Sequence, residues 1–339
     1  MSRSRLKLMK AFIWSIAGLA VVAGGLWFVP TNAVVLAPGI TGDLSQMVQV
    51  KGGHAPGPGR LLMVAVTIAR ANVLVQLVAR VDPNLEILPR QQAMGGLTMQ
   101  QYIQFNLALM QQSQWAAEVA GERLAGLPAR VVTVAGAVVE QVSKTGTAVG
   151  KIHPGDLIVR IGSYPVSGPA QVRSIMEKHF RVGEIVNFTV VRNHQQRVIP
   201  LKTTRIPGDP APGIGVLIGS LQRPVIPRTV TIHSQNIGGP SAGMMFALEI
   251  YQQVTGHQLA RGRIIAGTGE VSPNGQILQI GGVAQKVITV HRAGAQTFLV
   301  PAANYQKAEW MNHLKGYHMA IYPVHTLAQA LHDLTSLNS

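Results

Sequence analysis

The residues Gly238-Gly239-Pro240-Ser241-Ala242-Gly243 open an apolar run that ends at Thr255-Gly256. The run lacks the alternation of a strand, and Thr-Gly is a helix C-terminal signal, so we predict a buried helix from about Pro240. Ser241 then stands at the amino end of this helix, where unpaired backbone N–H groups stabilise an oxyanion. The alternative is a serine that only caps the helix, which is the commoner role of a serine in such a turn.

A lysine on the next predicted helix shifts this balance. Lys286 lies in a helix predicted over residues 283–293, with Val283 and Val290 on the same face. Loss of water disfavours the charged form of lysine, and a neutral amine takes a proton from a serine hydroxyl. The alternative is a lysine whose amine reaches solvent from this face. Catalysis therefore requires that Ser241 and Lys286 meet in space.

The segment between the two residues is predicted to form a β-hairpin. Residues 263–271 have the composition of a strand, Ser272-Pro273-Asn274-Gly275 is typical of a turn, and residues 275–280 form the return strand. A further strand is predicted before the serine, at Thr229 to His233, because its residues alternate with period two. Helix, hairpin and helix make a compact α/β unit.

This order of motifs resembles the proteolytic domain of the Lon proteases. Gly-Pro-Ser-Ala-Gly is followed by Thr268-Gly269-Glu270, by the Asn-Gly turn, by Ile280-Gly281-Gly282 and by the lysine helix. The likeness continues through Ala293 to Pro301 and into a final helix from Thr326. The resemblance implies a serine and lysine dyad.

Carried over residue by residue, the resemblance makes Ser241 the nucleophile and Lys286 the general base. It also implies that Thr268 helps to hold the lysine. Backbone N–H groups around the turn from Gly239 to Ser241, which contains Pro240 as a further supporting residue, are expected to hold the oxyanion.

The chain departs from the Lon pattern in its lack of a phosphate-binding loop. The nearest string to Gly-x-x-x-x-Gly-Lys-Ser/Thr runs from Gly146 to Ile152, is one residue short, and has Ile152 where a magnesium-binding hydroxyl is required. No His/Asp/Glu spacing resembles a metal site. We therefore expect an ATP-independent enzyme with no cofactor and no metal.

The N-terminus predicts a membrane anchor. Residues 1–10 are basic, and residues 11–29 contain no charge. At ~1.5 Å per helical residue, such a run spans a ~30 Å hydrocarbon core, and the basic side faces the cytoplasm. We therefore expect a single-pass protein of the cell membrane with an extracytoplasmic catalytic domain. The alternative is a signal peptide cleaved near Thr31-Asn32-Ala33.

Length and composition bound the remaining possibilities. The 339 residues suggest two domains, and the absence of cysteine excludes disulfides and thiolate chemistry. The net charge of +15 is dispersed and aromatic residues are only 5%, so no nucleic-acid surface is predicted. The expected partners are a peptide or unfolded protein substrate and the membrane, and the resemblance to Lon makes a homo-oligomer conceivable.

Residues 126–205 have the pattern of a small α+β module. Strands are predicted at residues 138–142 and 157–161, a helix at 169–179, and a closing strand pair at 185–192 and 196–201.

The segment from Thr147 to Ile158, which ends in Gly155-Asp156-Leu157-Ile158, resembles a PDZ domain. By resemblance, a peptide would add to the edge strand Val138 to Val142 and to a loop at Ala135, Gly136, Ala137 and Val138. The alternative is a structural spacer with an occluded groove.

The whole chain is therefore predicted as α+β, with a transmembrane helix, a PDZ-like domain and a Lon-type proteolytic α/β domain. Residues 34–125 contain strands predicted at 61–67 and 73–81 and a helix at 98–124. They are expected to be the first part of a discontinuous protease domain, or a separate α/β segment. Residues 219–339 form the part that carries the dyad.

The sequence thus predicts a membrane-anchored, ATP-independent serine endopeptidase that cleaves exported or surface peptides and proteins, with the PDZ-like module binding substrate. Two alternatives remain open. One is a peptide-binding scaffold with an inactive protease fold. The other is a Ser/Lys hydrolase of non-peptide acyl bonds.

Overall fold

The protein is described by a computed structural model that covers residue 14 and residues 24–206, 211–235 and 237–336. The chain forms two compact units. The first joins Met1–Arg130 to Ile226–Ser339, and the second is Val131–Val225. Helices and strands are mixed in both, which confirms the prediction of a mixed α and β structure.

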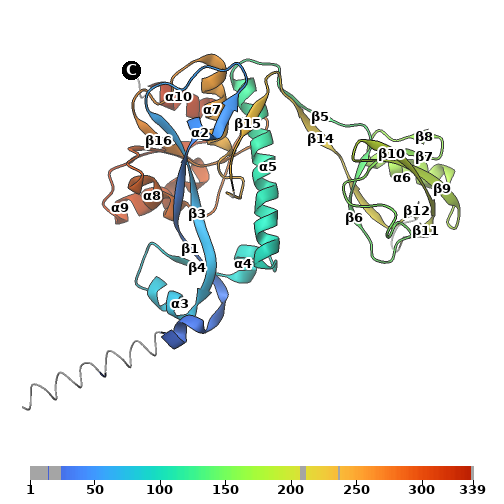
Figure 1. The fold of residues 1–339 in the computed structure, drawn as a ribbon, viewed down its shortest axis with the longest axis horizontal. Helices are drawn as coiled ribbons and strands as arrows, with labels where there is room; N and C mark the ends of the chain where they lie inside the picture. Colours follow the sequence, from blue (N-terminus) through green and yellow to red (C-terminus); the bar gives the residue numbers. More distant parts are fainter. Residues whose placement is uncertain (1–13, 15–23, 207–210, 236, 337–339) are drawn as a thin grey trace, which may run out of the picture. The chain divides into compact units, whose positions relative to one another are not determined.

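A six-stranded mixed sheet forms the centre of the first unit, in the order β20-β19-β16-β3-β1-β4. Its two long strands β3 and β1 lie side by side in Figure 1. Its strands are β1 (Pro30–Asp43), β3 (Arg60–Asn72), β4 (Glu86–Pro89), β16 (Ile264–Gly267), β19 (Thr297–Pro301) and β20 (Ala320–Val324). β1 is antiparallel to both β3 and β4, whereas β3, β16, β19 and β20 run parallel. The two chain segments therefore share one sheet.

Helices bury both faces of this sheet. On one face lie α5 (Met99–Leu124), α7 (Gly243–Thr255) and α10 (Leu327–Ser336), and on the other lie α8 (Val283–Arg292) and α9 (Tyr305–Leu314). Leu61 and Met63 of β3 pack into the first core, and Leu62 and Val64 into the second. Because successive strand residues point to opposite faces, a strand buried on both sides is apolar throughout.

Shorter elements complete the first unit: α2 (Leu44–Met47), β2 (Val48–Val50), α3 (Val73–Ala79), α4 (Arg90–Met94), β15 (Val230–Ile232), β17 (Glu270–Val271), β18 (Ile277–Leu278) and the 3₁₀ turn η1 (Ala302–Asn304). β17 and β18 form an antiparallel pair, and β15 pairs with β2. The strand predicted over residues 73–81 is wrong. The Asn72 side chain accepts the Val75 N–H and starts α3 there.

The second unit contains a six-stranded sheet in the order β10-β9-β7-β6-β13, with β8 paired to β7 outside this order. Its elements are β6 (Ala137–Val142), β7 (Leu157–Ile161), β8 (Tyr164–Pro165), α6 (Pro169–His179), β9 (Ile185–Arg192), β10 (Gln195–Lys202), β11 (Thr204–Arg205), β12 (Pro212–Gly213) and β13 (Val216–Gly219). β5 (Arg130–Thr133) pairs with β14 (Gln222–Val225). The unit includes residues after 205 because β13 joins its sheet.

The Gly-Asp motif of the second unit is anchored by an ion pair. Asp156 is buried, and the Arg192 guanidinium donates to both of its carboxylate oxygens at 2.6 Å. Burial opposes the charge, but Arg192 and the His153 N–H outweigh it and hold the pKa of Asp156 below its usual value. The pair fixes the start of β7 against the end of β9.

The prediction of a membrane anchor requires correction. Of residues 11–29, only residue 14 and residues 24–29 are described, so most of the predicted span lies outside the described residues. Within the described part of the chain, no helix is long and apolar enough to cross a membrane. This finding contradicts the predicted single-pass, cell-membrane location with an extracytoplasmic catalytic domain.

Candidate active site

Ser241 and Lys286 meet in the first unit. The Nζ atom of Lys286 lies 2.7 Å from the Oγ atom of Ser241. Ser241 precedes the first turn of α7, and Lys286 lies in the first turn of α8. Lys286 is only 2% exposed, so its amine does not reach solvent from the helix face.

Burial sets the protonation of this amine. Loss of hydration lowers the pKa of Lys286 to about 7. Lys286 forms no ion pair within the described ranges, so no carboxylate counteracts that loss. Glu270 lines the same cavity, and burial raises the pKa of its carboxyl. Near pH 7 a large fraction of the Lys286 side chains is therefore neutral, with a lone pair facing the serine hydroxyl.

Thr268 holds the lysine, in the position that the resemblance to Lon implies. Its Oγ1 atom lies 2.8 Å from Lys286 Nζ and donates to the Ser241 carbonyl oxygen at 3.0 Å. Because the hydroxyl proton is used on Ser241, the oxygen lone pairs are left to accept from the amine. Thr268 is fully buried, and its backbone N–H donates to Leu299 of β19.

The turn before the serine differs from the expectation in its hydrogen bonding. Gly239 has a φ of 90°, which favours glycine, but its N–H already donates to the Asn106 carbonyl oxygen at 2.8 Å. Pro240 has no N–H. The N–H groups of Ser241 and Ala242 make no hydrogen bond within the described part of the chain. These two groups, rather than Gly239, are the candidate oxyanion donors.

Helix α5 contributes residues that the sequence analysis missed. Asn106 accepts the Gly239 N–H, and Ser113 Oγ donates to the Pro240 carbonyl oxygen at 2.8 Å. A cavity of ≈ 260 Å³ opens beside Ser241. Its walls include Met63, Ala65 and Val66 of β3 and Tyr102, Asn106 and Met110 of α5. Asparagine and serine in a long helix carry no signal of this role, and Ser113 lies 127 residues from the carbonyl it binds.

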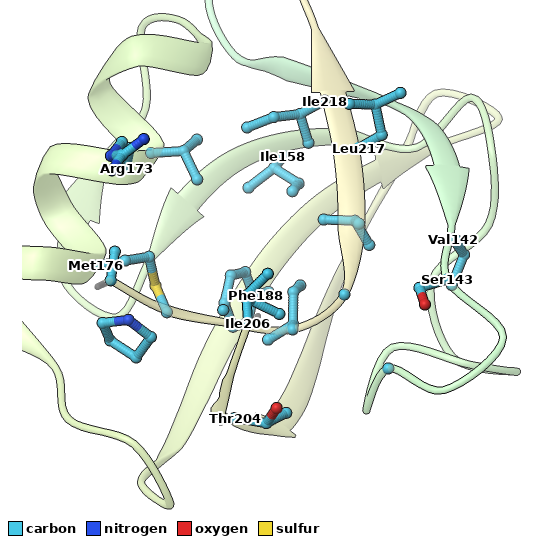
Figure 2. Close-up of a pocket in the computed structure, with 18 of the residues that line it drawn as sticks. Val142, Ser143, Ile158, Arg173, Met176, Phe188, Thr204, Ile206, Leu217 and Ile218 are labelled. Atoms are coloured by element: carbon cyan, nitrogen blue, oxygen red, sulfur yellow. The ribbon is translucent and has the colours of Figure 1, made fainter. Parts of the chain in front are cut away.

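A second cavity, of ≈ 760 Å³, lies in the second unit (Figure 2). Arg173 and Met176 of α6 lie on one side of it, and Leu217 and Ile218 of β13 lie on the other. Apolar residues of the sheet, Phe188 among them, line it between these elements. The cavity is therefore a groove between a helix and a strand at the edge of the sheet.

The residues predicted for peptide binding, Ala135, Gly136, Ala137 and Val138, do not line this groove. Strand β6 lies between β7, which pairs with Ala137 and Val138, and β13, which pairs along residues 138–142. On the side of β13, a peptide could add to β6 only by displacing β13. The run Gly215-Val216-Leu217-Ile218, glycine followed by β-branched and apolar residues, is the signal that would have indicated β13.

Comparison with known proteins identifies the segment that carries the dyad. Residues 232–336 match the family model of the Lon protease (S16) C-terminal proteolytic domain. The Lon protease of Haemophilus influenzae is 33% identical over 93 residues, which are 27% of this chain and 11% of that protein. The Lon protease of Chloroflexus aurantiacus is 38% identical over 93 residues, with the same shares.

The chain thus covers about a tenth of the length of these relatives, and the similarity concerns their proteolytic domain. One solved structure that is similar to part of the chain is the PDZ domain of the SdrC-like protein from Listeria monocytogenes, which is 25% identical in sequence. The match covers 26% of this chain and 90% of that chain, with a TM-score of 0.24. The equivalent domain from Listeria innocua has 26% identity, coverage of 24% and 92%, and a TM-score of 0.23. The match of residues 232–336 to the S16 domain supports a serine endopeptidase.

Replacement of Thr268 by valine tests how the amine is held. Thr268→Val keeps the size of the side chain but removes the hydroxyl between Lys286 Nζ and the Ser241 carbonyl oxygen. We expect a small acylating reagent to modify Ser241 about fivefold more slowly, since one positioning hydrogen bond of about 1 kcal/mol is lost. Thr268→Ser, which retains the hydroxyl, serves as the control. Equal labelling rates for the valine and serine variants would show that Thr268 does not position the lysine.

Proposed function

We propose that the protein is an ATP-independent serine endopeptidase that acts on peptides and unfolded protein segments. The observation that carries the proposal is the 2.7 Å contact between Ser241 Oγ and a buried lysine amine whose pKa is lowered to about 7. A lysine that is neutral near pH 7 and directed at a serine hydroxyl is an activated nucleophile pair.

In the first step, Ser241 Oγ attacks the carbonyl carbon of the scissile peptide bond, and its proton passes to Lys286 Nζ. The new C–O bond gives a tetrahedral oxyanion, which the N–H groups of Ser241 and Ala242 stabilise. The ammonium group then returns the proton to the leaving nitrogen, and the C–N bond breaks. An acyl-enzyme on Ser241 remains.

In the second step, water attacks the acyl-enzyme, and Lys286 takes a proton from the water. The tetrahedral intermediate collapses, the C–O bond to Ser241 breaks, and the proton returns to Oγ. Thr268 keeps the amine in place through both steps because it contacts Lys286 Nζ and the Ser241 carbonyl.

None of these steps consumes a nucleotide, and the 339 residues contain no phosphate-binding loop. The chemistry of the pair supplies no work to unfold a substrate. We therefore propose that substrates are peptides or segments of protein that are already unfolded.

We further propose that the groove between α6 and β13 binds a peptide. Strand β13 pairs only with β6 in the described sheet, so its outer edge offers N–H and C=O groups to an added strand. The lining includes Arg205, and no acidic residue lines it among the residues that the structure describes. An apolar peptide that carries a carboxylate suits this lining.

Substitution of the dyad tests the proposed chemistry. We expect Ser241→Ala and Lys286→Met to reduce peptide cleavage by about 10³-fold or more, because each removes one half of a unit that acts jointly. Lys286→Met is expected to leave the melting temperature unchanged or raised, since a methionine replaces a buried amine that lacks a carboxylate. The controls are Ser220→Ala and Lys307→Met on the surface. Cleavage of small esters but not of peptides would favour the non-peptide acyl hydrolase, and unreduced cleavage in both dyad variants would refute the assignment.

The pH dependence tests the base. Only the neutral amine accepts a proton, so the cleavage rate should rise about tenfold per pH unit below a pH of about 7 and level off above it. The folded pKa lies below the usual value of 10.5, so the unfolded chain binds more protons between about pH 7 and 10.5. The contribution of Lys286 to stability therefore rises with pH in that window. Initial rates from pH 5 to 9 would measure the profile, and a rate that falls as pH rises through 7 would exclude the neutral lysine base.

Filling the groove of the second unit tests peptide binding there. Ala170 is exposed and lines the groove, so Ala170→Phe should block its mouth. We expect cleavage of a long unfolded protein to slow several-fold, while a short peptide is cleaved at the parent rate. Lys178→Phe, on the same helix but outside the lining, is the matched control. Equal slowing of both substrates would show that the groove does not recruit the long one.

A further inference from the structure

Strand β3 has an unpaired edge. It runs from Arg60 to Asn72, but β16 pairs with it only from Arg60 to Met63. Beyond Met63, β1 continues along one side as far as Asn72. Within the described residues, no strand pairs with the other side of that stretch. Such an edge presents backbone N–H and C=O groups that another strand can bind.

The pairing with β1 shows which groups face the free side. Pro38 lies directly opposite Val66. Opposed residues of an antiparallel ladder either exchange two N–H···O bonds or none, and proline has no N–H to give. Pro38 and Val66 are therefore a non-bonded pair. Val66 and, two residues further, Ile68 direct their N–H and C=O groups away from β1.

This free side borders the cavity at the dyad. Ala65 and Val66 line the same cavity as Ser241 and Lys286, with helix α5 forming another wall. The main-chain groups of Ile280, on another wall, are already used, because the Asn304 side chain accepts the Ile280 N–H and donates to its carbonyl oxygen, both at 2.9 Å. The edge of β3 is a wall that still has main-chain groups to offer along several residues.

We propose that the substrate binds as an extended strand on this edge, hydrogen-bonded to the backbone of Val66 and Ile68, with its scissile carbonyl beside Ser241. This proposal rests on the proposed endopeptidase function. Strand addition selects by backbone and requires several consecutive residues in extended form. A folded protein cannot supply such a segment, whereas an unfolded one can.

The test uses the full-length protein and a substrate peptide of about eight residues. The peptide is made in a series of variants, each of which carries one N-methyl group on a different backbone nitrogen. A strand paired on one side uses the N–H groups of alternate residues only. Away from the scissile bond, we expect kcat/KM to fall about tenfold at every second position and to stay within about twofold at those between. Losses that do not alternate would overturn the proposal.

A substitution in β3 tests whether the substrate pairs with this edge. Ile68→Pro removes one N–H from the free side without removing a bond to β1, and Ile68→Ala removes side-chain atoms but keeps the N–H. We expect only the proline variant to lower kcat/KM about tenfold, and to make one of the sensitive N-methyl positions insensitive. An unchanged pattern in a folded proline variant would overturn the proposal. If that variant does not fold, the alternation measured with the parent protein decides.

Labelling of Ser241 by a small acylating probe separates the two hypotheses. The probe does not need the strand edge, so Ile68→Pro should be labelled at the parent rate. A parent protein that neither reacts with the probe nor cleaves the peptide would refute the proposed function itself. Normal labelling and cleavage without alternation would refute only strand addition on β3.

Discussion

The site in the first unit depends on one interaction, the contact between a serine hydroxyl and a lysine amine that is shielded from water. Lys286 forms no ion pair among the residues that the structure describes, and burial lowers its pKa to about 7. The amine is therefore a base because of the packing around it. Three valines of helix α8, Val283, Val287 and Val290, are fully buried in the core between the sheet and helices α8 and α9. Any change that lets water reach α8 would restore the charge and remove the base.

The geometry of the serine depends on a helix from the distant N-terminal segment. Helix α5 packs against α7 so closely that a Cβ atom on Gly121 would lie 2.7 Å from the Ala247 carbonyl oxygen. The same helix holds the Gly-Pro-Ser turn through Asn106 and Ser113. The main chain of the turn is thus fixed by hydrogen bonds to residues outside the segment that matches the Lon proteolytic domain. The N-terminal segment is part of the site as well as of the fold.

The two proposed binding edges would give both units a common means of holding an extended chain. In the first unit, β16 ends at Gly267 and leaves β3 unpaired beside the dyad. In the second, β13 covers β6 and presents its own outer edge to the groove beside α6. Main-chain recognition is tolerant of sequence, because every residue except proline carries the same donor and acceptor. A protease that acts on unfolded segments is served by recognition of this kind.

Local signals in the sequence determined the elements and chemistry of the C-terminal part of the site. The Gly-Pro-Ser turn, the Asn-Gly hairpin and the apolar face around Lys286 are short-range patterns, and each has a physical meaning that does not depend on the rest of the chain. Only the tertiary structure decided that Asn106 uses the Gly239 N–H, that Ser241 and Ala242 are the free donors, and that β13 takes the edge of β6. Hydrogen bonds between residues more than a hundred positions apart leave no periodicity or spacing in a sequence, because they follow from how packed elements approach one another. The short strand β13 and the start of α3 at Asn72 were missed for a related reason. A short apolar run is compatible with a helix and with a strand. For α3 a single hydrogen bond to the Asn72 side chain decides the outcome, and for β13 the neighbouring strand β6 decides it.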